Sequence, residues 1–101
     1  MSHENGAFDF KKMKKLVVTG LAEITANNPG FEKRFANELG DEIGQAYGNA
    51  THLIFNPIQI KIGFIVDTWK HQMGEAATLS HVKRCLLNID ARYLAEKLDS
   101  L

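Results

Sequence analysis

The sequence has a single cysteine, two prolines, one tryptophan and no excess of charge of either sign. Cys85 has no second cysteine with which to form a disulfide, a usage typical of intracellular proteins. Twelve basic residues balance twelve acidic residues. This balance argues against a protein that binds nucleic acid mainly by neutralising phosphates, because that mode requires an excess of Lys and Arg. A local basic patch is still compatible with this overall balance of charge.

Long apolar runs are also missing. No stretch approaches the roughly 20 consecutive apolar residues of a membrane-spanning helix, and the N-terminal region lacks the pattern of a signal peptide. We therefore expect no membrane span and a cytoplasmic protein. A chain of 101 residues supports one hydrophobic core rather than two. We expect residues 1–8 to form a disordered tail, because they offer little apolar surface, and residues 9–101 to form a single domain.

The densest apolar repeat runs through residues 58–69 and ends at the only tryptophan. Apolar side chains recur there at steps of four, three and four, which places them on one face of a helix: Ile58, Ile62, Ile65 and Trp69. Asn56 and Pro57 should begin this helix, because proline is tolerated in a first helical turn. Gly74 should end it. Thr78 should cap the next helix with its hydroxyl, and Asp90 should cap a last one.

The first half of the chain predicts three further helices. Asp9 should cap the first, which carries apolar residues at steps of three and four up to Ile24. The sequence ANNPG at residues 26–30 breaks it, because the residue before a proline is disfavoured in a helix. Residues 31–39 form the second helix, and Asp41 should cap a short third one. We expect Leu53, Ile54 and Phe55 to form an extended piece packed against the core.

These segments together predict an all-α fold of six antiparallel helices without internal repeats. A period of two at residues 59–64 would also suit a β-strand, but the helical stripe through Trp69 extends further and favours a helix.

The second half of the sequence resembles a death domain. The resemblance is carried by Trp69 near a helix end, Gly74, the pair Ala77 and Thr78, and the closing run YLAEKL at residues 93–98. Upstream, residues 31–40 resemble the second helix of that family. The resemblance implies a death-domain-like Greek-key bundle of six helices. It also implies a non-enzymatic module, without cofactor, that binds other death-fold domains to assemble signalling complexes in apoptosis or innate immunity. A related death-fold subfamily remains an alternative.

The resemblance further implies which surface charges contact a partner. In the family, helices 1 and 4 of one molecule commonly meet helices 2 and 3 of another, and further contacts use the corner between helices 5 and 6. On the first side the candidates are Lys14, Lys15, Asp67 and Lys70. On the second side they are Lys33, Arg34, Asp41 and Glu42. The corner offers Asp90 and Arg92.

The helix at residues 58–73 presents a second apolar pair on the face away from its buried stripe. On a helix of 3.6 residues per turn, Ile60 and Phe64 lie nearly opposite Trp69, on the same side as Asp67 and His71. We hypothesise that Ile60 and Phe64 anchor an interface for self-association or for a partner, with Asp67 and His71 at its rim. The alternative is that the segment at residues 53–55 folds back and covers them.

Catalytic and metal-binding patterns are weak. His81 and Cys85 stand four residues apart, as do Asp67 and His71, but neither pair has a third group at a supporting spacing. We therefore interpret Cys85 as a buried apolar residue and predict no enzyme and no cofactor.

Nucleic-acid binding is the alternative function. Lys11, Lys12, Lys14 and Lys15 could contact phosphate, but a solvated helical face is the simpler interpretation. No predicted helix offers the Arg, Asn and Gln cluster that reads base edges, so we rank a small helical nucleic-acid-binding domain second.

Overall fold

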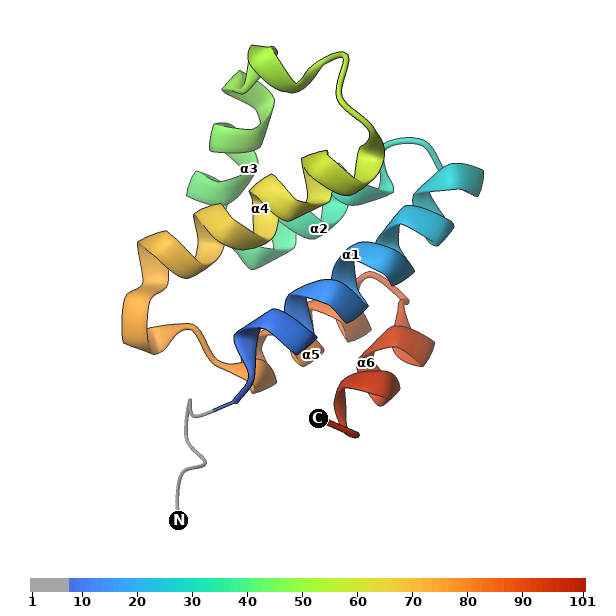
Figure 1. Ribbon diagram of the computed structural model, residues 1–101, viewed down its shortest axis with the longest axis vertical. Helices are drawn as coiled ribbons and strands as arrows, with labels where there is room; N and C mark the ends of the chain where they lie inside the picture. The colour runs from blue at the N-terminus through green and yellow to red at the C-terminus, as the bar shows by residue number, and fades with distance from the viewer. Residues whose placement is uncertain (1–7) are drawn as a thin grey trace.

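A computed structural model describes residues 8–101, and this part of the chain is an all-helical bundle (Figure 1). It contains six α-helices and two short 3-10 helices, and no strand occurs within residues 8–101. The elements in order are α1 (Phe10–Asn27), α2 (Phe31–Leu39), α3 (Asp41–Asn49), η1 (Thr51–Leu53), α4 (Ile58–Met73), η2 (Gly74–Ala76), α5 (Leu79–Asn88) and α6 (Arg92–Leu98). The predicted all-α, six-helix bundle is therefore confirmed.

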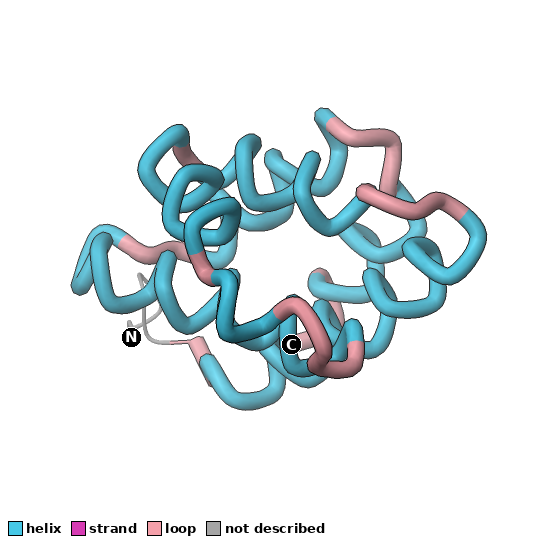
Figure 2. Tube along the Cα trace, turned by 90° about the horizontal axis from the view of Figure 1, so that it is seen from above, coloured by secondary structure: helices cyan, strands magenta, loops and turns pink. Residues whose placement is uncertain are grey.

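Helices that are distant in the sequence form much of the packing. α1 lies against α4 and α6, while α2 lies against both α3 and α5. α1 and α4 run side by side in opposite directions (Figure 1). Seen from above, the helices surround a common centre (Figure 2).

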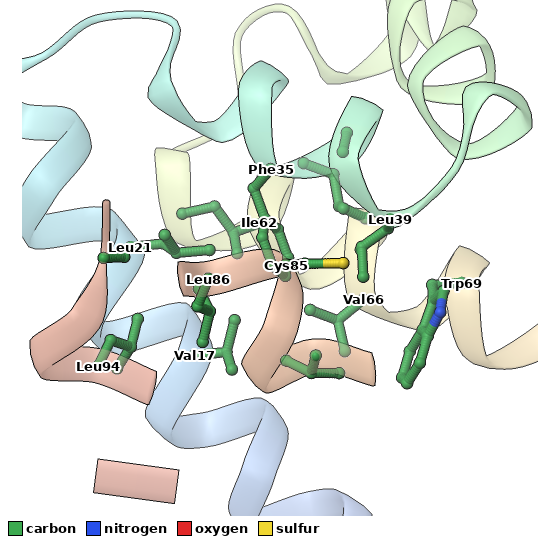
Figure 3. Packing of buried hydrophobic residues seen from close by; sticks show 14 of the residues in the cluster. Val17, Leu21, Phe35, Leu39, Ile62, Val66, Trp69, Cys85, Leu86 and Leu94 are labelled. Atoms are coloured by element: carbon green, nitrogen blue, oxygen red, sulfur yellow. The ribbon is translucent and has the colours of Figure 1, made fainter. Parts of the chain in front are cut away.

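The core draws on every α-helix, and Figure 3 labels members of it from α1, α2, α4, α5 and α6. Ile62, Ile65 and Trp69 of the predicted stripe are fully buried, and Ile58 is half-buried. They meet the buried faces of the other helices, including Val17, Leu21, Phe35, Leu86 and Leu94. The helical periodicity therefore identified the buried face of α4 correctly.

Three predicted helix boundaries are confirmed. The Asp9 side chain accepts a hydrogen bond from the Lys12 backbone N–H at 3.1 Å, so it caps α1. The Thr78 hydroxyl accepts one from the His81 N–H at 3.3 Å and caps α5. Gly74 ends α4 with φ +56°, a conformation that glycine adopts without steric cost.

Two predicted caps are wrong. Asp90 does not cap α6; it has φ +65° and ends α5 instead. The Asp90 N–H donates to the Leu87 carbonyl and the Ala91 N–H to the Leu86 carbonyl, the paired bonds of a Schellman motif. Asp41 is the first residue of α3, and Gly40 occupies the cap position without a side-chain bond.

The expected extended piece at residues 53–55 is also wrong. Residues 51–53 form the 3-10 helix η1, and of the three apolar residues only Leu53 is buried. Of the expected N-terminal tail, residues 1–7 lie outside the described part of the chain, and Phe8 is partly buried and packs against the core. Within residues 8–101, no helix combines the length and the apolar character needed to cross a membrane.

Candidate interaction surface

The connection between α3 and α4 exposes two large apolar side chains. Phe55 is 99% exposed and Ile54 is 59% exposed. The 3-10 turn of η1 directs Leu53 into the protein, and the chain then turns back through the Asn56 N–H, which donates to the Leu53 carbonyl at 3.0 Å. Ile54 and Phe55, called the tip below, are left exposed, and the α3–α4 connection that carries them lies at one end of the molecule in Figure 1.

Beside the tip, the outer face of α4 is partly apolar. Ile60 is 52% exposed, as the sequence predicts for the face opposite Trp69. Phe64 is only half-buried, and the His52 ring packs edge-on against it with ring centroids 5.9 Å apart. The expected exposure of Ile60 is confirmed, whereas part of Phe64 is covered by the His52 ring and not by Ile54 and Phe55, which are themselves exposed. The role of Ile60 and Phe64 in an interface stays a prediction.

A hollow of about 500 Å³ opens on this face between α1, η1 and α4. Its apolar lining comes from Val18, Leu53, Ile60 and Phe64. Gly63 also lines it, and a Cβ built on Gly63 would have only the Lys14 side chain nearby, at 3.7 Å. A side chain larger than that of glycine at position 63 would therefore project into the open hollow. It is called the α4 hollow below.

The charges at the rim of the α4 hollow neutralise each other. Lys14 Nζ of α1 donates to Asp67 Oδ2 of α4 at 2.9 Å, and both side chains are partly exposed. Such an exposed pair contributes about 0–1 kcal/mol to stability. The pair of Lys14 and Asp67 leaves the rim of the α4 hollow without net charge.

The remaining candidates on α1 and α4 lie on the surface. Lys15 and His71 are exposed. Lys70 is half-buried, and its ammonium lies 5.7 Å from the centre of the Phe10 ring. Of the four charges expected to act together on this side, only Lys14 and Asp67 form an ion pair within the described part of the chain.

The candidates on α2, α3 and the α5–α6 corner are exposed, and none of them lines the α4 hollow. The Arg34 guanidinium lies 5.4 Å from the centre of the Phe31 ring, which orients it along α2. The others are Lys33 of α2, Asp41 and Glu42 in the first turn of α3, and Asp90 and Arg92 at the corner.

His81 and Cys85 do approach each other, with Cys85 Sγ 3.7 Å from His81 Nε2. Their polar atoms face backbone carbonyls: the Cys85 thiol donates to Glu38 O at 3.4 Å, and His81 Nε2 lies 3.3 Å from Leu39 O. The His81 ring stacks on Trp69, with the two planes 8° apart and the centroids 5.9 Å apart. This arrangement joins α5 to α2 and α4.

The surroundings of Cys85 disfavour the reactive thiolate. The pKa of the Cys85 thiol is raised to about 11, mainly by burial and also by the Glu38 carboxylate, while Arg84 partly opposes both. A thiol with this pKa is almost fully protonated at neutral pH and is a poor nucleophile. Within residues 8–101, no three His, Cys, Asp or Glu side chains gather as a metal site would require.

A second polar contact lies between α2 and α3. The Tyr47 hydroxyl donates to Glu32 Oε2 at 2.8 Å, and burial together with this carboxylate raises the pKa of Tyr47. Glu32 Oε1 is buried and has no hydrogen-bond partner among the described residues. The contact fixes α3 against α2.

The sequence interpretation missed Phe55 as a surface residue. A signal for it was present, because residues 43–60 contain no Asp, Glu, Lys or Arg, in a chain with 24% charged residues. The cores of protein interfaces are depleted of charged residues in the same way.

Comparisons with protein-family models, with curated proteins and with solved structures gave no match.

Proposed function

We propose that this protein is a non-enzymatic interaction module that binds other death-fold domains and assembles cytoplasmic signalling complexes, as in apoptosis or innate immunity. The resemblance of residues 31–40 and 69–98 to death domains supports this proposal, and a six-helix bundle is the architecture that the resemblance implies.

The observation that carries the proposal is the apolar surface at the α3–α4 end. Phe55, Ile54 and Ile60 are all more than half exposed, beside a hollow lined by apolar side chains. Large apolar groups that cluster on a surface are typical of contact sites, whereas single exposed apolar residues are common everywhere. Aromatic anchors supply much of the affinity of protein interfaces.

The surface charges have a different role in this proposal. Exposed ion pairs contribute about 0–1 kcal/mol each, so they orient partners more than they hold them. Lys15 and Lys70 on one side, and Lys33, Asp41 and Glu42 on another, are suited to selecting which death-fold partner docks and in which orientation.

The experiment is a pull-down with the full chain as bait, followed by identification of the captured proteins and reconstitution with the purified partner. The double variant Ile60→Ser, Phe64→Ser should lose the partner. A matched control, Leu87→Ser with Tyr93→Ser, removes two other exposed apolar side chains and should retain it. Circular dichroism establishes that each bait is folded.

Phe64 is half-buried, so the single variant Ile60→Lys serves if the double variant unfolds. It places a charge on an exposed position and should abolish binding without disturbing the core. Equal capture by wild type and folded Ile60→Lys would contradict this use of the surface. Salt-sensitive recovery of DNA or RNA in place of a death-fold protein would instead support the nucleic-acid alternative, through the lysines of α1.

A further inference from the structure

The tip and the α4 hollow form a complementary pair on one molecule. Phe55 is almost entirely exposed, so it does not fill the hollow of its own chain. Leu53 and Ile60, which lie two residues before and five residues after Phe55, both line the hollow. Two residues span at most about 7 Å of chain, so the Phe55 backbone lies close to the lining of the hollow.

We infer that two copies of this chain dimerise through this end, each inserting Phe55 into the α4 hollow of the other. This inference rests on the proposed function, because it names the partner of the same apolar surface. A projection and a cavity side by side on one face make a self-complementary patch. A two-fold axis then uses both at once and closes the assembly at two copies.

The charge distribution favours a second copy over a charged partner. Residues 43–60 carry no Asp, Glu, Lys or Arg, so the tip brings no ionised side chain into the contact. The two charges at the rim of the hollow, Lys14 and Asp67, are already paired with each other at 2.9 Å. An uncharged aromatic side chain therefore enters without leaving a buried charge unpaired, which would cost free energy.

The area involved sets the strength of this dimer. A buried aromatic side chain removes about 150–250 Å² from water. Two phenyl rings and the hollow walls that they cover give about 600–1,000 Å² in total, which lies below the 1,200–2,000 Å² of stable complexes. We therefore expect a weak dimer that forms where the chain is locally concentrated.

The test uses the purified full chain in sedimentation equilibrium between about 10 µM and 1 mM. The average mass of the wild type should rise towards twice the monomer mass and stop there. Phe55→Ser removes the projecting ring and should weaken dimerisation at least tenfold. Gly63→Leu fills the hollow from its lining, where a Cβ meets only ordinary contact, and should do the same.

Mixing these two variants gives the sharpest result. Phe55→Ser keeps an open hollow and Gly63→Leu keeps its phenyl ring, so the mixture can make one of the two insertions. It should form a one-to-one dimer that is weaker than that of the wild type and stronger than that of either variant alone. Isotope-filtered NMR of the mixture should show contacts from the Phe55 ring of one chain to Ile60 of the other. Leu87→Ser is a control at an exposed apolar position on α5 and should dimerise like the wild type.

Several outcomes overturn the inference. These are a wild type that stays monomeric at 1 mM, a folded Phe55→Ser variant that dimerises normally, a mixture without heterodimer, or growth beyond the dimer. The circular dichroism and thermal melting of each variant identify any loss of fold. A monomeric wild type that still captures a death-fold domain through Ile60 would refute the dimer and leave the proposed function standing.

Discussion

Trp69 offers the most direct test of how the core is built. Its side chain is 0% exposed, it ends the apolar stripe of α4, and it stacks on His81 of α5. Trp69→Ala should therefore lower the free energy of unfolding by about 3–5 kcal/mol, the usual cost of removing a large buried aromatic group. Domains of this size have about 5–15 kcal/mol in total, so the variant should be close to unfolding.

Trp69→Phe separates the packing of the ring from its polar atom. Trp69 Nε1 is buried and has no hydrogen-bond partner among the described residues. Replacing indole by phenyl leaves a smaller ring, which costs stability, but it removes a buried donor whose lost hydration costs about 1–3 kcal/mol. These effects oppose each other, so Trp69→Phe should change the free energy of unfolding by less than about 2 kcal/mol.

Urea unfolding followed by circular dichroism measures both variants. With a denaturant dependence of about 1.5 kcal/mol per molar urea, Trp69→Ala should lower the midpoint by about 2–3 M. Leu87→Ala is the control, because Leu87 is 47% exposed and its truncation should shift the midpoint little. A midpoint for Trp69→Ala equal to that of the control would refute the assignment of Trp69 to the core.

Two further predictions concern packing and the buried thiol. Gly20→Ala would place a Cβ 2.6 Å from Cδ1 of the buried Leu94, so it should destabilise the protein by about 1 kcal/mol despite alanine's better helix propensity. Gly48→Ala meets nothing within 4 Å and should stabilise the protein by about 0.5–1 kcal/mol. A stabilising Gly20→Ala or a destabilising Gly48→Ala in urea unfolding would contradict the corresponding prediction. Because the pKa of Cys85 is raised to about 11, alkylation at pH 8 should be slow in the folded protein and fast in urea. Because the pKa of Cys85 is higher in the folded protein than its unfolded value near 9, the stabilisation from its bound proton is complete below pH 9 and is lost as the pH rises through 11. The free energy of unfolding should therefore fall between these two pH values, and Cys85→Ala should remove this part of the decline.

The sequence predicted the helices where the information was local and repeated. The spacing of Ile62, Ile65 and Trp69 extends over two turns, so neighbouring residues reinforce one interpretation. Thr78 and Asp9 were identified as caps because each precedes an apolar helix and can bond an amide three residues on.

The errors arose where one residue type suits two local structures. Asp90 was expected to begin a helix, but aspartate also tolerates positive φ, and there it closes α5. The apolar run Leu53, Ile54 and Phe55 suggested burial, but the turn of η1 buries only the first of the three. Composition alone does not reveal this, because the direction of each side chain depends on a turn whose geometry is set by contacts with α4.

The position of α1 between α4 and α6 has a consequence for synthesis of the protein on the ribosome. The apolar face of α1 emerges first, yet one of its partners, α6, begins only at Arg92. At about 5–20 residues per second, the interval from Asn27 to Arg92 lasts about 3–13 s. For that time the nascent α1 lacks part of its native cover, so Val17 and Leu21 are accessible to chaperones before the bundle closes.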